Sequence, residues 1–290
     1  MEPLWDALLV PLWNRALPLL VWLVGLTAVF VPLEILFAAH PPAPRGRQWA
    51  VNLAYYFLNS LIAATLVAMP LSVLTVTLHD LLPARWLAVV ADWPLWLRLI
   101  AGLIVSETGY YWGHRLSHQI PWLWRFHAIH HSASSLDYLV NSRAHPLDMV
   151  FSRLCALTPL YALGLGTPVH LEGGLVPVVL SILATAWGFF VHANLNWRFG
   201  PLEWLVSTPA FHHWHHTRSG PHDRNFSSTL PGLDLLFGTL HLPAEFPTDY
   251  GISSSMPDSL IDQVLYPLAP ELTTGQVAEP QLESTRLSDS

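Results

Sequence analysis

The sequence predicts an all-α integral membrane protein with about four transmembrane helices (range three to five) and a helical cap on the cytoplasmic side. Three observations carry this prediction. Hydrophobic residues make up 52% of the 290 positions and charged residues only 11%, against about a quarter in a typical soluble domain. The mean hydropathy is +0.38. The fourteen tryptophans suit a membrane–water interface, where this side chain is enriched.

Three apolar stretches approach or exceed the roughly 20 residues that a membrane-spanning helix needs. The first is interrupted only by Glu34, the second carries no charge, and the third contains Arg98 and Glu107. Their approximate bounds are 17–38, 50–78 and 95–112. Acidic residues precede the first stretch, where a cleavable signal peptide would carry basic ones, so we expect it to remain as an anchor.

Two further apolar regions follow, at about 147–165 and 175–191. The first of them is short and is broken by Arg153 and Pro159, whereas the second is cleaner. We expect the two to form a hairpin or a re-entrant pair joined near residues 164–174. Whether both regions cross the membrane completely stays open.

Three regions are predicted along the chain. Residues 1–94 form N-terminal anchor spans, and residues 95–247 form a second domain that carries most of the sixteen histidines. Residues 248–290 are rich in Ser, Thr, Pro, Asp and Glu. Such a composition buries too little apolar surface to fold, so we expect a disordered tail there.

The orientation follows from the basic residues. The loop after the first span contains Arg45 and Arg47 and no acid, which places it in the cytoplasm. Alternation then puts the end of the third span on the same side, where Arg115 and Arg125 follow it. Every histidine cluster is thereby predicted on the cytoplasmic face.

The histidines form three spaced motifs. An HxxxH pair is followed by an HxxHH group, and a second HxxHH group lies about 80 residues later; the three consist of His114 and His118, of His127, His130 and His131, and of His212, His215 and His216. Helical positions i, i+3 and i+4 share a face. We expect the first two histidines of each HxxHH group to face one ion and the third to reach a neighbouring ion.

Eight imidazoles exceed the needs of one tetrahedral ion and suit two metals. Imidazole binds Zn, Cu, Fe and Ni alike, so the ligands alone do not select the metal. Cys155 is the single cysteine, which excludes a cysteine-based metal cage. The sequence contains no basic patch, so we expect no nucleic-acid partner. The rival interpretation is a membrane metal-binding or transport protein that catalyses no reaction, but transport favours ligands at mid-membrane, and these motifs lie at and beyond span ends.

These motifs resemble the fatty acid hydroxylase/sterol desaturase superfamily, whose histidine motifs occur in this order. The resemblance runs from His114 to about Thr239. It includes Phe126-His-Ala-Ile-His-His-Ser132, Arg143-Ala-His145-Pro-Leu, His192-Ala-Asn194, Thr208-Pro-Ala-Phe-His-His-Trp-His-His216, Asp223-Arg-Asn-Phe226 and Leu230-Pro-Gly-Leu-Asp-Leu-Leu-Phe-Gly-Thr239.

The resemblance implies two non-haem iron ions, O2 activation, and hydroxylation or desaturation of a lipid C–H bond in lipid biosynthesis or modification. It adds His192 and His145 to the eight motif histidines as candidate ligands, and leaves His213 outside the ligand set. Asp223, Asn194, Asn196 and Glu107 are candidates to orient the ligating rings. For Glu107 a direct ligand role also stays open, because an acid inside an apolar span is costly.

The partners implied are a lipid substrate, the membrane and an external electron donor of the cytochrome b5, ferredoxin or rubredoxin type, since no fused electron carrier is visible. The compact chain with short loops favours a bacterial inner membrane. Hydroxylation is preferred slightly over desaturation, and the lipid stays open.

Overall fold

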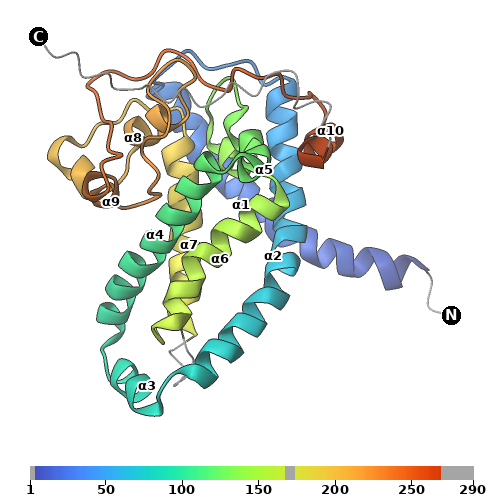
Figure 1. Ribbon diagram of the computed structural model, residues 1–290. Coiled ribbons are helices and arrows are strands. Elements are labelled where there is room, and N and C mark those ends of the chain that lie inside the picture. The colour runs from blue at the N-terminus through green and yellow to red at the C-terminus, as the bar shows by residue number, and fades with distance from the viewer. Residues whose placement is uncertain (1–3, 167–173, 269–290) are drawn as a thin grey trace, which may run out of the picture.

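The structure is a computed structural model that describes residues 4–166 and 174–268, and this part of the chain is helical (Figure 1). Its only extended pairing in these ranges is an isolated bridge between Thr217 and Tyr250. The elements are α1 (Leu4–Leu36), α2 (Arg47–Leu81), α3 (Ala84–Ala91), α4 (Leu95–Gln119), α5 (Pro121–His131), η1 (Tyr138–Ser142), α6 (Pro146–Ala162), α7 (Leu175–His192), η2 (Gly200–Trp204), α8 (Pro209–His215), α9 (Gly232–Leu236), α10 (Leu260–Leu265) and η3 (Tyr266–Leu268).

The short helices α5, α8, α9 and α10 and the segments that join them lie at one end of the molecule, here called the cap (Figure 1). The long helices α2, α4, α6 and α7 extend away from the cap, and α3 lies at the far end. Two segments are long and apolar enough to cross a membrane, Ala16–Leu36 and Leu175–His192. Two bent pairs raise the total to four: the halves of α2, at 41°, and α3 with α4, at 115°. The expected number of about four spans is the upper end of this range.

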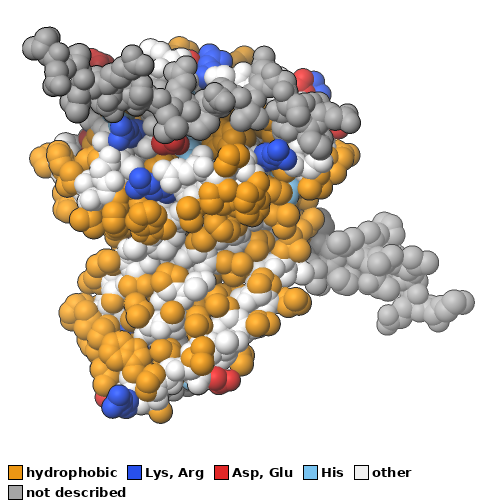
Figure 2. Space-filling model, viewed as in Figure 1, with side chains coloured by type: hydrophobic (Ala, Val, Ile, Leu, Met, Phe, Trp, Pro, Cys, Tyr) orange, Lys and Arg blue, Asp and Glu red, His pale blue; other side chains and the backbone are white. Residues whose placement is uncertain are grey.

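The outer surface of the long helices is apolar, as lipid contact requires. Val24, Met69, Ile104 and Ile182 are all at least half exposed. Figure 2 shows hydrophobic side chains over this part of the molecule, with charged side chains at the cap and at the opposite end. The chain is therefore a membrane protein whose cap lies at one end of the helices.

Glycines allow α4 and α6 to pack closely. A Cβ at Gly109 would lie 2.1 Å from the Cys155 carbonyl oxygen, and a Cβ at Gly113 would lie 2.6 Å from the Cys155 Cβ. The α4 backbone can approach α6 this closely only because these positions lack a side chain. This packing sets the position of the C-terminal turns of α4, which carry two of the motif histidines.

The expected disordered tail is wrong for its first part. Residues 248–268 belong to the cap: Tyr250 pairs with Thr217, and α10 packs against α2. Arg47 at the start of α2 forms an ion pair with Asp258 at 2.9 Å. Met256, Leu260 and Val264 also pack against the buried side chains of Val51, Tyr55 and Ile129. The composition missed these contacts because they join segments that are distant in the sequence. The rest of the expected tail lies outside the described residues, as does most of the expected hairpin turn at 164–174.

Candidate metal centre

Three helices carry the histidine motifs to the cap end of the bundle. HxxxH occupies the last turns of α4, the first HxxHH ends α5, and the second occupies α8 and its C-cap. Pro121 and Pro209 begin the two short helices. Proline suits the first position of a helix because the backbone N–H there has no partner within the helix. The Thr208 hydroxyl caps α8 by accepting from Phe211 N at 3.4 Å. Each motif is thereby fixed on a helix with a defined start.

Nine histidines converge in two groups, within each of which the nitrogens lie no more than 4.8 Å apart. The five-histidine group consists of His114, His118, His127, His131 and His215. The four-histidine group consists of His130, His192, His212 and His216. The groups adjoin, because the rings of His131 and His216 stack at 4.4 Å between centroids.

The division of each HxxHH motif differs from the expectation. The first and last histidines share a group, His127 with His131 and His212 with His216, and the middle one crosses to the other group. At 3.6 residues per turn, i+4 is rotated about 40° from i, whereas i+3 is rotated about 60° the other way. The i+4 ring is therefore the better aligned with the first. His130 and His215 thus link the two groups.

The ring nitrogens approach as metal ligands do. The Nε2 atoms of His114 and His131 each lie 3.1 Å from His127 Nε2, and His192 and His212 Nε2 lie 2.9 Å apart. Metal–nitrogen bonds of about 2.1 Å at right angles place two nitrogens about 3.0 Å apart. His118 Nε2 and His215 Nε2 are buried without a hydrogen-bond partner among the described residues. The residues fit a pair of bound cations.

The opposite nitrogen of several rings is held by the protein. Nδ1 of His114 donates to the Phe226 carbonyl at 2.6 Å, and Nδ1 of His192 to that of Gly188 at 2.7 Å. His130 and His215 donate likewise to the carbonyls of Arg143 and Arg224, at 3.0 and 2.8 Å. These bonds place the proton on Nδ1 and leave Nε2 free as a ligand.

Asp148 holds a fifth ring, and the sequence interpretation missed it. Its Oδ2 lies 3.0 Å from His127 Nδ1, and both side chains are buried. Asp148 lies in the first turn of α6, three residues after His145. The available signal was an acid two residues after the His145-Pro146 pair of the resembling segment.

The four predicted orienting residues separate into one that contacts a ring and three that do not. Asp223 Oδ1 lies 3.4 Å from His118 Nδ1, as expected of an orienting acid. Asn194 bonds instead to the backbone of His40, at 3.0 and 2.8 Å, and Asn196 is exposed. Glu107 accepts from Thr229 N at 2.8 Å, so it anchors the cap to α4 and lies outside both groups.

His145 is placed away from both histidine groups. Its Nδ1 accepts from Leu147 N at 3.1 Å as the N-cap of α6, and its Nε2 bonds to the Val264 carbonyl at 3.2 Å. Both nitrogens are engaged by backbone, so the ligand assignment for this residue is corrected to a capping role. The corresponding contacts were invisible in the sequence because Val264 is 119 positions away.

His213 is outside the groups, as expected, but it is fully buried. Its Nε2 donates to the Ala193 carbonyl at 3.0 Å, and its Nδ1 accepts from the Tyr250 hydroxyl at 2.8 Å. This ring fastens α8 to the end of α7 and to the segment after residue 248. Its role is structural.

Burial lowers the pKa of several imidazoles of the two groups. It lowers the pKa of His130 to about 4, with a further lowering from His127, and it lowers the pKa of His212, His215 and His216 well below the ordinary value. A protonated ring cannot bind a metal through that nitrogen. The centre is therefore ready to coordinate cations at neutral pH.

Residues 99–239, which contain every histidine of both groups, match the family of fatty acid hydroxylases. In this stretch the chain is similar to fatty acid hydroxylases. The matched stretch begins in α4 and ends after α9, so it includes most of the cap. No solved structure matches the chain significantly.

The chain is also similar to several curated proteins. The ornithine lipid hydroxylase OlsE of Rhizobium tropici is 35% identical over 61% of this chain and 52% of its own length. Alkylglycerol monooxygenase of Xenopus tropicalis is 29% identical over 56% of this chain and 34% of its own. A very-long-chain aldehyde decarbonylase of Oryza sativa subsp. indica is 33% identical over 45% and 21%. The matched region thus spans about half the length of the first relative and less of the others.

Proposed function

We propose that the chain is a membrane-bound di-iron oxygenase that hydroxylates a C–H bond of a lipid with O2 and electrons from an external donor. The observation that carries the proposal is the pair of adjoining histidine groups, whose Nε2 atoms converge while the protein holds the opposite nitrogens. The relatives named as lipid hydroxylases and monooxygenases support the reaction class.

Two bound irons would supply the reduction of O2 and the oxidation of the C–H bond. The residues of this chain hold and shield them. We assign five ligands to one iron and four to the other, as the two groups divide. Most of these rings are buried, which excludes bulk water, and the carbonyls of Phe226, Arg143, Arg224 and Gly188 with Asp148 fix the ring orientations.

The rival function, metal transport, is less well supported by the arrangement. Transport favours polar sites along the spans near mid-membrane. Both histidine groups instead lie together at the cap ends of α4 and α7. Within the described ranges no further group of potential metal ligands occurs along the helices. An enzyme that works on lipids at the membrane surface explains this location.

The first experiment measures the metal content of the purified protein after iron-replete expression, with Mössbauer or X-ray absorption spectroscopy. Two irons per chain with nitrogen-dominated ligation support the proposal. One zinc per chain, or no metal, would contradict it. His215→Ala removes a ligand from the five-histidine group and His130→Ala removes one from the four-histidine group. Each variant should therefore lower the iron content, and each should lose the spectral signal of a different iron environment.

The second experiment identifies the reaction by the lipids of cells that express the wild type or His130→Ala. Hydroxylation adds one oxygen that carries the isotope label of supplied O2, and desaturation removes two hydrogens without adding oxygen. A wild-type product that incorporates labelled oxygen supports hydroxylation. The candidates to test first are aminoacyl lipids and alkylglycerols, because the relatives' names specify these classes.

The external donor is sought by reconstitution with cytochrome b5-, ferredoxin- and rubredoxin-type reductase systems.

A further inference from the structure

Two short helices of the cap have their polarity inverted. In η2, Leu202 and Trp204 are 59% and 53% exposed whereas Glu203 is 2% exposed. In α9, Leu235 and Leu236 are 53% and 71% exposed whereas Asp234 is fully buried. A surface helix in water shows the reverse pattern. Both helices therefore present apolar side chains outward and their acids inward.

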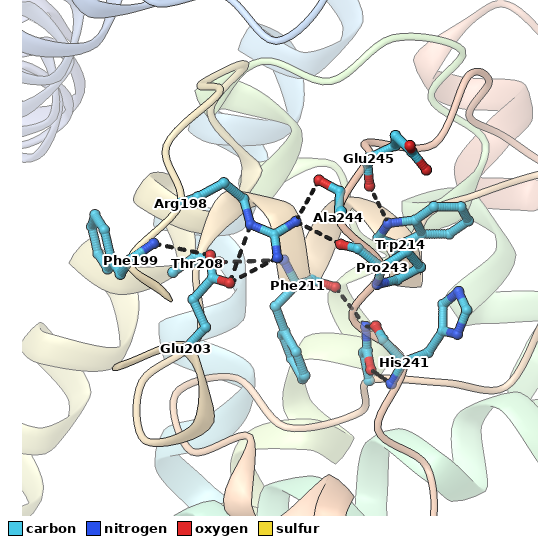
Figure 3. A network of polar contacts seen from close by, with 11 residues as sticks. Arg198, Phe199, Glu203, Thr208, Phe211, Trp214, His241, Pro243, Ala244 and Glu245 are labelled. Atoms are coloured by element: carbon cyan, nitrogen blue, oxygen red, sulfur yellow. Dashed lines mark hydrogen bonds and ion pairs between the residues drawn. The ribbon is translucent and has the colours of Figure 1, made fainter. Parts of the chain in front are cut away.

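Glu203 is held inward by a bonded network (Figure 3). Its Oε2 accepts from Arg198 Nη2 and Nε at 2.9 and 3.1 Å, and its Oε1 accepts from Phe199 N and the Thr208 hydroxyl at 3.1 and 3.3 Å. Arg198 also donates to the carbonyls of Pro243 and Ala244. Since Thr208 caps α8, the outward face of η2 is fixed relative to the metal centre.

Asp234 is held inward in the same way. It accepts from Phe226 N at 2.7 Å, from Ser227 N at 3.0 Å and from the Thr239 hydroxyl at 2.7 Å. Phe226 also provides the carbonyl that receives His114 Nδ1. The outward leucines of α9 are consequently the other face of a segment that supports the five-histidine group.

The two helices form one surface, here called the η2–α9 lobe (residues 200–205 and 232–236). A Cβ at Gly232 of α9 would lie 3.9 Å from the Trp204 carbonyl oxygen. Phe237, directly after α9, contacts the rings of Tyr111 and Trp112 of α4 at 5.1 and 5.0 Å. The lobe therefore adjoins α4, whose Trp112 is itself 42% exposed, and its apolar surface continues that of the membrane helices.

We propose that the η2–α9 lobe is a second membrane contact, which inserts its leucines and Trp204 into the interfacial zone of the leaflet on the cap side. Three features select the bilayer over a soluble partner: the inward acids, the exposed tryptophan suited to the interface, and continuity with a surface that faces lipid. Insertion would hold the metal centre at a fixed height above the leaflet. The proposal does not depend on which metal or reaction the centre supports.

The test uses the single native cysteine. With Cys155→Ala as background, Leu236→Cys and Leu205→Cys are each labelled with an environment-sensitive NBD fluorophore, and the proteins are reconstituted in nanodiscs. Glu245→Cys, an exposed charged position of the cap, is the matched control. Variants enter the comparison only if they elute like the wild type in gel filtration.

We expect both lobe labels to emit at shorter wavelength than the control and to lose most of their fluorescence when the nanodiscs contain doxyl-labelled lipid. The control label should keep its fluorescence. Lobe labels that remain in water, with control-like emission, would overturn the proposal. Short-wavelength emission without quenching by doxyl lipid would also overturn it, because a second protein copy and not the bilayer would then cover the lobe.

Discussion

At the residue scale, the centre depends on groups that never touch a metal. His127 illustrates this: its Nε2 approaches two neighbouring rings at 3.1 Å, which is possible because its Nδ1 bonds to Asp148. Asp148 is buried and lies 3.0 Å from its ring, whereas Asp223, the other carboxylate beside a ring of the two groups, is half exposed and lies 3.4 Å from His118. It also adds negative charge beside an otherwise neutral ligand set, which raises ligand basicity.

Asp148→Asn should therefore weaken the five-histidine site while the protein still folds. Loss of such an acceptor typically costs about 10–100-fold in metal affinity or activity. The measurement is iron retained after dialysis against a graded series of chelator concentrations. The exposed Asp258→Asn serves as the matched control and should retain iron like the wild type. Equal retention by both variants would show that Asp148 does not support the site.

Adjacent histidines of α8 should behave differently on substitution. His215→Ala should lower metal content, because its Nε2 belongs to the five-histidine group. His213→Ala should keep the metal per folded chain but lower Tm, because Ala193 O and the Tyr250 hydroxyl lose a partner, at about 1–3 kcal/mol for each unsatisfied buried group. Thermal unfolding and elemental analysis on the same samples separate the two effects. A metal-deficient but fully stable His213→Ala would reverse the assignments.

At the element scale, the long helices and the three histidine motifs could be predicted from the sequence, because apolar length and helical spacing are local properties. The division of the HxxHH motifs depended on the small angular difference between i+3 and i+4, which the simple rule of shared faces does not resolve. The capping role of His145, the anchoring role of Glu107 and the order of residues 248–268 all rest on contacts between distant segments. No local pattern reports such contacts.

The crossing of α4 and α6 gives an element-scale prediction. Gly109→Ala would place a Cβ against the Cys155 backbone, so α4 must move away from α6. His114 and His118 then shift relative to His127, whose partner Asp148 lies on α6. We expect lower iron content and a lower Tm. Gly25→Ala is the control, since nothing lies within 4 Å of a Cβ there, and it should be mild; equal effects would show that the crossing is not critical.

At the scale of the whole molecule, the position of the α1–α2 loop relative to the histidines links the predicted sidedness of the loop to that of the metal centre. Arg47 reaches Asp258 of the cap, and Gln48 bonds to Ser134 and Ser135 directly after α5. The loop and the metal centre therefore share one end of the molecule. α3 and Asp92 lie at the other end, beyond the apolar surface (Figures 1 and 2). The positive-inside rule applied to Arg45 and Arg47 therefore also predicts that the metal centre lies on the cytoplasmic side.

Sidedness is tested with one cysteine at each end, in the Cys155→Ala background. Gly46→Cys should resist a membrane-impermeant maleimide in intact cells and react once the cells are opened, because the positive-inside rule predicts a cytoplasmic loop. Asp92→Cys should react in intact cells, because it lies on the opposite side. The reverse pattern would place both histidine groups outside the cytoplasm, where cytoplasmic reductases could not reach them. The proposed electron supply would then have to come from a donor on the outer face or within the membrane.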